Sequence, residues 1–282
     1  MNNAHQFINF IRSHGYDPVP EITAGKWIRF GRKKAVSAMF YEDGMGGILH
    51  DWSTGSKYHW FADRDHESPD EWEKRQKEMD AIRRASQAKE ELAHASVAKR
   101  AEKLFKEAPI ASDEHGYLVK KQVSSHGLKQ VGHELLVPVY SVIGEFQTIQ
   151  FITDSTYTSG NNKRFFTGGK KKGGCHFIGE IVVGKPVYIC EGYATAVSVY
   201  EDTQSLTIVA FDSGNLIHVA TDLRAQMPDI EIMIAGDCDD AGVRAAEAGA
   251  KAVNGSTLFP SFGDNPNKYS DWNDYFTNWV NK

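Results

Sequence analysis

Apolar and polar residues alternate in strand-length and helix-length stretches from about residue 184 to the end of the sequence. Four short runs rich in Val, Ile and Leu are typical of buried strands: PVYIC, LTIVAF, EIMIA and STLFP. Between them lie stretches of helical composition that begin near Tyr193, Asn215 and Ala241. Strands that alternate with helices of about 10–12 residues predict an α/β unit over residues 184–282, with a mostly parallel sheet covered on both faces.

A β-rich pattern precedes this unit, over residues 110–183. The apolar alternation in LLVPVYSVIGEFQTIQFI predicts a hairpin that turns near Gly144, and HGYLVKKQVSSHGL predicts a short helical connector. The segment KRFFTGGKKKGGCHFIGE then places three lysines between two glycine pairs. A turn of this kind lets backbone N–H groups and ammonium groups approach phosphates together.

Residues 1–66 predict a small α+β unit. Its helix lies in AHQFINFIRSHG, where Phe7 and Ile11 are at helical spacing and Gly15 is suited to end the helix. Short strands follow in KWIRFGRKKAVSAMFYEDGMGGILHDW. Tryptophan in a small β unit is more often a core residue than a surface on which bases stack. Both roles stay open for the three tryptophans of this unit, Trp27, Trp52 and Trp60.

A long charged helix is expected between these regions, over residues 67–109. Ser68 suits the N-cap, Pro69 suits the first helical position, and Pro109 ends the pattern. Because few of its residues are apolar, we expect this helix to be mostly solvated and to join two units.

Three of the predicted strands of the α/β unit end in carboxylates. Glu191 follows the first strand, Asp212 follows the second, and Asp237 and Asp239 follow the third. Because the carboxyl ends of parallel strands meet at one edge of a sheet, we expect Glu191 to lie near the Asp pair. Each carboxylate alone is also compatible with a helix cap or a turn. Their combination at one edge favours a site for Mg²⁺ or Mn²⁺ and phosphate.

Composition narrows the class of protein. With 41% hydrophobic and 24% charged residues, the chain is typical of a globular protein. No apolar run approaches the ~18 residues of a membrane span, and the N-terminus lacks the pattern of a secretory signal. The cysteines Cys175, Cys190 and Cys238 are far apart and form no CxxC motif. We therefore expect a reducing cytoplasm and no zinc site.

Charge is unevenly distributed along the chain. Residues 184–282 hold 6 Lys and Arg against 14 Asp and Glu, whereas the first 183 residues hold 26 against 23. A nucleic-acid-binding protein needs basic stripes where the phosphates lie, although solvated surface charge is the alternative explanation. Two stripes occur among glycines and aromatic residues: Lys26, Arg29, Arg32, Lys33 and Lys34, and then Lys163, Arg164, Lys170, Lys171 and Lys172.

Four motifs in the last hundred residues resemble one family. They are EGYATA at 191–196, AFDSGNL at 210–216, GDCDDAG at 236–242 and DWND at 271–274. This order is similar to that of the Toprim domain, which primases, topoisomerases and some nucleases share. The form EGYATA resembles the Toprim DNA primases of satellite phages and conjugative plasmids, and segments upstream resemble the same group. The resemblance implies a Toprim domain preceded by a basic β-rich region and the small N-terminal unit.

The resemblance also implies an activity and roles for residues. The expected reaction is synthesis of short RNA primers on single-stranded DNA from ribonucleoside triphosphates, with Mg²⁺ or Mn²⁺. Glu191 would act as general acid or base, and Asp237 and Asp239 would hold the metal. Asp271 and Asp274 are candidates for a further ligand. Whether Asp212 belongs to this centre or is only a turn residue stays open. Phosphates would be bound by Lys163, Arg164, Lys170, Lys171 and Lys172, with possible DNA contacts from Arg29, Arg32, Lys33 and Lys34.

The sequence departs from chromosomal primases in two respects. They have an aspartate four residues after the glutamate, whereas this chain has Thr195, so their full metal set does not carry over. The sequence also has no cysteine or histidine cluster for a zinc module and no GxxxxGK[ST] helicase motif. We therefore expect the choice of initiation site to come from the N-terminal unit or a partner, or to be loose, and any replicative helicase to be a separate protein.

Other functions remain open at this stage. A Toprim nuclease would use the same carboxylates to cut DNA, and a non-catalytic DNA-binding accessory protein would use them structurally. A topoisomerase is disfavoured because 282 residues leave little room for gate domains. A primase in the cytoplasm of a bacterial host cell, without membrane association, is the preferred hypothesis.

Overall fold

The computed structural model describes residues 2–62, 69–157, 160–262 and 269–280. Contacts within the chain divide it into two units, Met1–Ala88 and Lys89–Lys282. The four domains expected at 1–66, 67–109, 110–183 and 184–282 stay a prediction.

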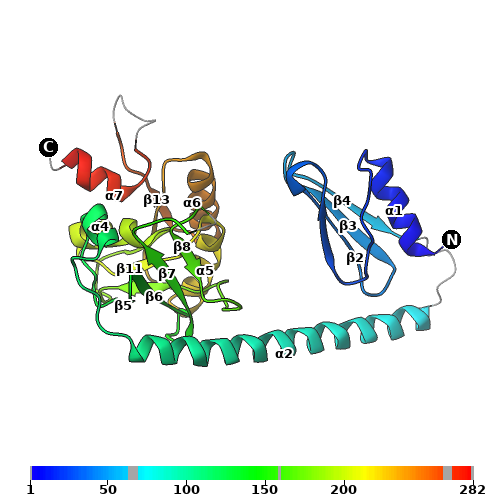
Figure 1. Cartoon of the computed structure of the whole chain (residues 1–282), viewed down its shortest axis with the longest axis horizontal. Coiled ribbons are helices and arrows are strands. Elements are labelled where there is room, and N and C mark those ends of the chain that lie inside the picture. The colour runs from blue at the N-terminus through cyan, green and yellow to red at the C-terminus, as the bar shows by residue number, and fades with distance from the viewer. Residues whose placement is uncertain (1, 63–68, 158–159, 263–268, 281–282) are drawn as a thin grey trace. The chain divides into compact units, whose positions relative to one another are not determined.

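The first unit is an antiparallel four-stranded sheet with a helix along one face (Figure 1). Its strands lie in chain order, β1 (Trp27–Phe30), β2 (Val36–Phe40), β3 (Gly46–Asp51) and β4 (Ser56–Phe61). A 3₁₀ turn, η1 (Arg32–Lys34), joins the first two strands. The helix α1 (Asn3–Ser13) packs on the sheet through Phe7 and Ile11, which are fully buried. Gly47 permits this contact, because a Cβ there would lie 2.5 Å from the Phe7 ring.

The long helix α2 (Pro69–Glu107) has 39 residues and crosses the boundary between the two units. Its described side chains are mostly exposed up to residue 100, and several form ion pairs four residues apart. Near its C-terminal end, Ala101, Leu104 and Phe105 pack against the next sheet. The predicted solvated helix is confirmed.

A second antiparallel sheet opens the second unit. The short helix α3 (Gly116–Lys121) precedes its four strands in the chain. Its strands again follow chain order: β5 (Lys129–Val131), β6 (Glu134–Tyr140), β7 (Phe146–Thr153) and β8 (Lys163–Phe165). The predicted hairpin is β6–β7, and Gly144 in its turn adopts a φ of +85°, which favours glycine.

A five-stranded mixed sheet forms the C-terminal part of the second unit. Its strands are β9 (His176–Ile178), β10 (Val187–Cys190), β11 (Thr207–Val209), β12 (Ile232–Ala235) and β13 (Ser256–Leu258). They lie in the order β13-β12-β10-β11-β9, with β10 to β13 parallel and β9 antiparallel to β11. The four predicted parallel strands are confirmed. The sequence pattern did not predict β9, which comes from the β-rich region and completes the sheet at one edge.

Helices cover both faces of this sheet. On one face lie α5 (Ser213–Gln226) and α6 (Asp240–Ala252); on the other lie α4 (Tyr193–Thr203) and α7 (Trp272–Tyr275), followed by a π-helical turn, η2 (Phe276–Val280). Successive residues of β10 alternate between these layers, so Ile189 packs with α5 and α6 whereas Cys190 packs with α4. Leu135 and Val137 of β6 belong to the same core as α4. The two sheets of the second unit therefore share one core.

No helix in the described part of the chain is both long and apolar enough to cross a membrane.

Candidate active site at the carboxyl edge of the mixed sheet

Glu191 and Asp237 lie at the carboxyl ends of two adjacent parallel strands. Glu191 directly follows β10, Asp237 comes two residues after β12, and these strands pair in register. Burial raises the pKa of Glu191, although the nearby Lys163 ammonium acts in the opposite direction. The glutamate and the aspartate are thus brought together as the strand order predicts.

Asp237 is the more strongly perturbed carboxylate. Burial and the charge of Glu191 raise the pKa of Asp237 to about 7. Asp271 and Asp239 act in the same direction, and Lys163 acts against them. Oδ1 of Asp237 is buried and accepts no hydrogen bond from any described residue. Such a group is unstable as a lone anion and is stabilised by a proton or by a cation.

Asp239 and Asp212 both cap helices. Asp239 accepts a hydrogen bond from the Gly242 amide at 2.6 Å and begins α6, and Asp212 accepts one from the Asn215 amide at 3.0 Å and begins α5. Asp239 nevertheless acts electrostatically on Asp237, as described above. A cap uses one carboxylate oxygen, so capping and cation binding are compatible.

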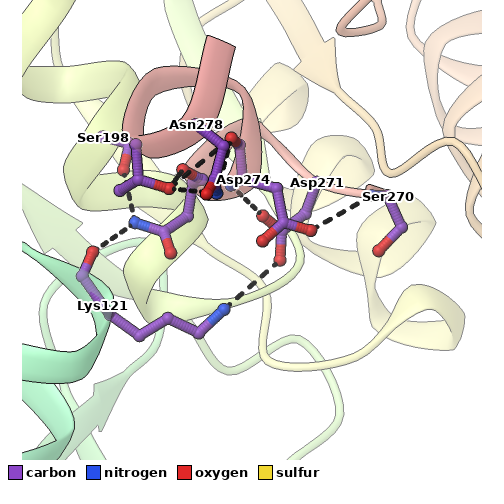
Figure 2. Close-up of polar contacts among 8 residues, drawn as sticks. Lys121, Ser198, Ser270, Asp271, Asp274 and Asn278 are labelled. Carbon is purple, nitrogen blue, oxygen red and sulfur yellow. Dashed lines mark hydrogen bonds and ion pairs between the residues drawn. The ribbon is translucent and has the colours of Figure 1, made fainter. Parts of the chain in front are cut away.

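Asp271 and Asp274 are the two predicted residues of the DWND motif, and they differ in their surroundings. Asp271 caps α7, and its Oδ2 lies 3.8 Å from Nζ of Lys121 (Figure 2). Asp274 instead accepts a hydrogen bond from the Ser270 amide at 3.1 Å. Asn273 fixes this segment, because its buried amide donates to the Lys121 carbonyl at 2.7 Å. Asp271, unlike Asp274, is among the charges that shift the pKa values of Asp237 and Lys163.

Lys163 and Arg164 are neighbours on β8, yet they interact with different groups. Burial lowers the pKa of Lys163, against the charges of Glu191, Asp271 and Asp237, which raise it. Arg164 is instead bonded in two places to Glu134, at 3.0 and 2.8 Å, with its guanidinium 4.0 Å from the Phe151 ring centre. Lys163 thus belongs to the acidic centre, whereas Arg164 is held in an ion pair with its own sheet.

The lysine-rich turn between β8 and β9 is anchored to the α/β sheet by Asn215. Its three lysines, Lys170, Lys171 and Lys172, are exposed. The Asn215 amide accepts from the Gly173 backbone at 2.8 Å and donates to the Gly174 carbonyl at 2.9 Å. The turn that presents the lysines is therefore fixed at the start of α5.

The remaining predicted contacts lie in the first unit. Arg32, Lys33 and Lys34 are exposed on η1, and the Arg29 guanidinium lies 5.7 Å from the ring centre of Trp52. Trp27 and Trp52 are more than half exposed, whereas Trp60 packs in the core.

The donor set fits a divalent cation in part. The orphaned Oδ1 of Asp237 and the mutual repulsion of the carboxylates favour a cation. Within the described part of the chain, no three Asp, Glu, His or Cys side chains are already arranged as a metal cage. A cation would therefore draw in the carboxylates around Asp237.

Two contributors to this site were not predicted from the sequence. Lys121 lies in the segment HGYLVKKQVSSHGL, where nothing in the pattern separates it from a solvated lysine. Asn215 lies within the AFDSGNL motif, which was singled out for its aspartate and not for its asparagine.

The family comparison agrees with this geometry. Residues 186–279 match the family model described as the Toprim domain. This region is a Toprim domain. It includes Glu191, Asp237, Asp239, Asp271 and Asp274, whereas Lys121 and Lys163 lie upstream of it.

Relatives of known name extend the similarity beyond the Toprim domain. The chain is 32% identical over 258 residues to a DNA primase TraC of Escherichia coli. This match covers 85% of this chain and 24% of that protein. A second DNA primase TraC of Escherichia coli is 37% identical over 150 residues, 49% of this chain and 10% of the relative. The chain thus spans a quarter or less of the length of these relatives.

Solved primase structures resemble the fold more weakly. The primase fragment of the bacteriophage T7 primase-helicase protein has a TM-score of 0.43 and 16% identity, covering 57% of this chain and 69% of that chain. The DnaG primase catalytic domain bound to single-stranded DNA has a TM-score of 0.44 and 11% identity, covering 68% and 77%. The family assignment rests on the sequence matches.

Proposed function

We propose that this chain is a DNA primase, a nucleotidyltransferase that makes short RNA primers on single-stranded DNA from ribonucleoside triphosphates. The observation that carries the proposal is its 32% identity to a DNA primase over 85% of the chain, together with the Toprim match of residues 186–279. Replication of a phage-type or plasmid-type DNA inside a bacterial cell is the setting that the motif EGYATA favours.

Asp237 and Asp239 are the proposed metal ligands. Toprim domains bind divalent metals such as Mg²⁺, and Asp271 and Asp274 are the candidates for further ligands. When bound, Mg²⁺ or Mn²⁺ supplies charge neutralisation to the triphosphate and favours attack by a 3′-hydroxyl. The orphaned oxygen of Asp237 supports this assignment.

Glu191 is the proposed general acid or base. Its raised pKa, caused mainly by burial, makes it a better proton acceptor than a solvated glutamate. Lys163 is close enough to act on its charge and so restrains that shift. An ammonium in this position is suited to a triphosphate oxygen once the nucleotide is bound.

The exposed basic residues are proposed to hold the nucleic acid. The turn fixed by Asn215 would present ammonium groups to template or nucleotide phosphates. Proposed phosphate contacts are Lys163, Lys170, Lys171 and Lys172; Arg164 would contribute only by exchanging its Glu134 partner. Arg29, Arg32, Lys33 and Lys34 are proposed DNA contacts of the first unit. A separate replicative helicase is the proposed protein partner.

A doubly labelled reaction tests this function. Single-stranded DNA labelled at its 5′ end is incubated with labelled ribonucleotides and Mg²⁺ or Mn²⁺. The proposal predicts short ribonucleotide products and an intact template. A shortened template without such products would favour a Toprim nuclease, and a template that is bound without either reaction would favour an accessory protein.

A further inference from the structure

The sheet of the first unit has a face, opposite α1, on which aromatic and cationic side chains are exposed. Strand residues alternate, so the face opposite α1 takes every second position. Cross-strand pairing aligns them in two rows: Trp27, Met39, Ile48 and His59, and then Arg29, Ser37, His50 and Lys57. Phe61 continues the face along β4. None of these strand residues, all of which the structure describes, is acidic.

Three large aromatic residues of this surface are exposed to an unusual degree. The exposed fractions are 54% for Trp27, 57% for Trp52 and 55% for Phe61. Leaving such large apolar surfaces in water is unfavourable, and clusters of them in a folded protein are typical of binding sites. On the opposite face of the sheet, α1 packs against buried apolar residues of β2 and β3.

Trp52 is held in a fixed position over this face. Its indole Nε1 donates a hydrogen bond of 2.8 Å to Oγ of Ser37, and its ring centre lies 3.8 Å from that of His50. The Arg29 guanidinium lies 5.7 Å from the same ring. An exposed ring that is already oriented loses little conformational entropy when a planar group stacks on it.

We propose that this face, defined by the exposed residues Trp27, Arg29, Trp52 and Lys57, binds single-stranded nucleic acid by stacking its bases. Stacking on aromatic rings tolerates every base, and cationic groups beside the rings attract the phosphates. The exposed basic turn η1 extends from the end of β1 and adds three cationic residues. That the bound strand is the template for primer synthesis rests on the proposed function. The first unit would thus bind the template with little dependence on its base sequence.

Binding of a labelled oligodeoxythymidine of about 15 nucleotides to the full chain tests the proposal by fluorescence anisotropy. Trp52→Ala should raise the Kd about 5- to 150-fold, the range that corresponds to loss of one stacked base. Trp27→Ala should weaken binding in the same direction. Wild-type tryptophan fluorescence should be quenched by the oligomer, and Trp52→Ala should lose part of that quenching. Leu92→Ala is the matched control, because this leucine is also exposed but lies on α2.

Each outcome has a distinct meaning. Unchanged Kd values for both tryptophan variants would overturn the proposal. A Trp52→Ala variant that keeps its Kd but sediments as a smaller species would also overturn it, because the face would then join two copies of the chain. Asp237→Ala should abolish primer synthesis and keep the oligomer Kd. If wild type makes no primers while Trp52→Ala still weakens binding, the proposed function fails and the binding face stands.

Discussion

The Asp237 carboxylate is strained electrostatically by its position. Burial and three neighbouring carboxylates raise its pKa to about 7, and one of its oxygens accepts no hydrogen bond from the described residues. Burial and repulsion disfavour the ionised form of Asp237. A bound divalent cation would offset both effects. Residue-scale tests should therefore separate the charge of Asp237 from its shape.

Metal-free protein should lose stability as pH rises from about 4 to about 7. In this window Asp237 loses its proton in the unfolded chain but keeps it in the folded chain. Rising pH therefore stabilises the unfolded state relative to the folded state. The loss should be on the order of 4 kcal/mol. Asp237→Asn should reduce this slope, leaving the part that comes from Glu191, whose pKa burial also raises. Mg²⁺ should restore stability at pH 7 only in wild type. Urea unfolding across this pH range measures the effect; equal slopes for both proteins would contradict it.

Lys163 and Arg164 should separate function from stability. Lys163→Met removes the ammonium of the acidic centre and should lower primer synthesis by about 10²-fold or more. Arg164→Met breaks the partly exposed pair with Glu134 outside that centre and should lower the free energy of unfolding by about 1 kcal/mol or less. Its synthesis should stay near wild type below the melting temperature. Equal losses of synthesis in both variants would contradict the placement of Lys163.

Single elements explain which parts of the structure were predictable from sequence. Strands β10, β11 and β12 were predictable because each places apolar residues against helices on both faces. The three-residue strand β9 carries little pattern of its own and is strand only because it pairs with β11. Likewise, sequence proximity grouped Lys163 with Arg164, and only the partners of β8 separate their roles. The orientation of Trp52 is fixed by a hydrogen bond to Ser37, a contact between two strands that no local sequence pattern predicts.

The anchoring of the lysine-rich turn is a property of elements, since Asn215 ties this turn to α5. Asn215→Ala should lower the free energy of unfolding by about 1–3 kcal/mol, because the Gly173 N–H and the Gly174 carbonyl lose their partners. Trypsin should then cut faster at Lys170, Lys171 or Lys172. Thr221→Ala, an exposed change on the same helix, is the control and should alter neither result. An unchanged cleavage rate in Asn215→Ala would show that other contacts hold the turn.

At the scale of the molecule, two units are separated within one helix. The boundary between them falls after Ala88, in a part of α2 whose side chains are mostly exposed. A helix without buried contacts opens locally at low free-energy cost.

Limited trypsin digestion should cut first in α2, between residues 77 and 89, where Lys and Arg are exposed. Mass spectrometry should then find a lasting fragment that contains both sheets of the second unit. First cuts inside either sheet would contradict the division into units.

The acidic edge of the Toprim domain and the basic groups upstream of it belong to one unit with a shared core. We propose that metal, triphosphate and reacting hydroxyl meet at this edge of the sheet and that metal binding depends on Asp237. Template binding and chemistry should respond separately to mutation.

The most direct test measures ribonucleotide incorporation on single-stranded DNA with Mg²⁺, comparing wild type with Asp237→Ala. We expect short RNA products from wild type and a loss of about 10²-fold or more in Asp237→Ala, with DNA binding retained. Equal synthesis by the two proteins would contradict the assignment of Asp237, and the absence of RNA products from wild type would contradict the proposed function.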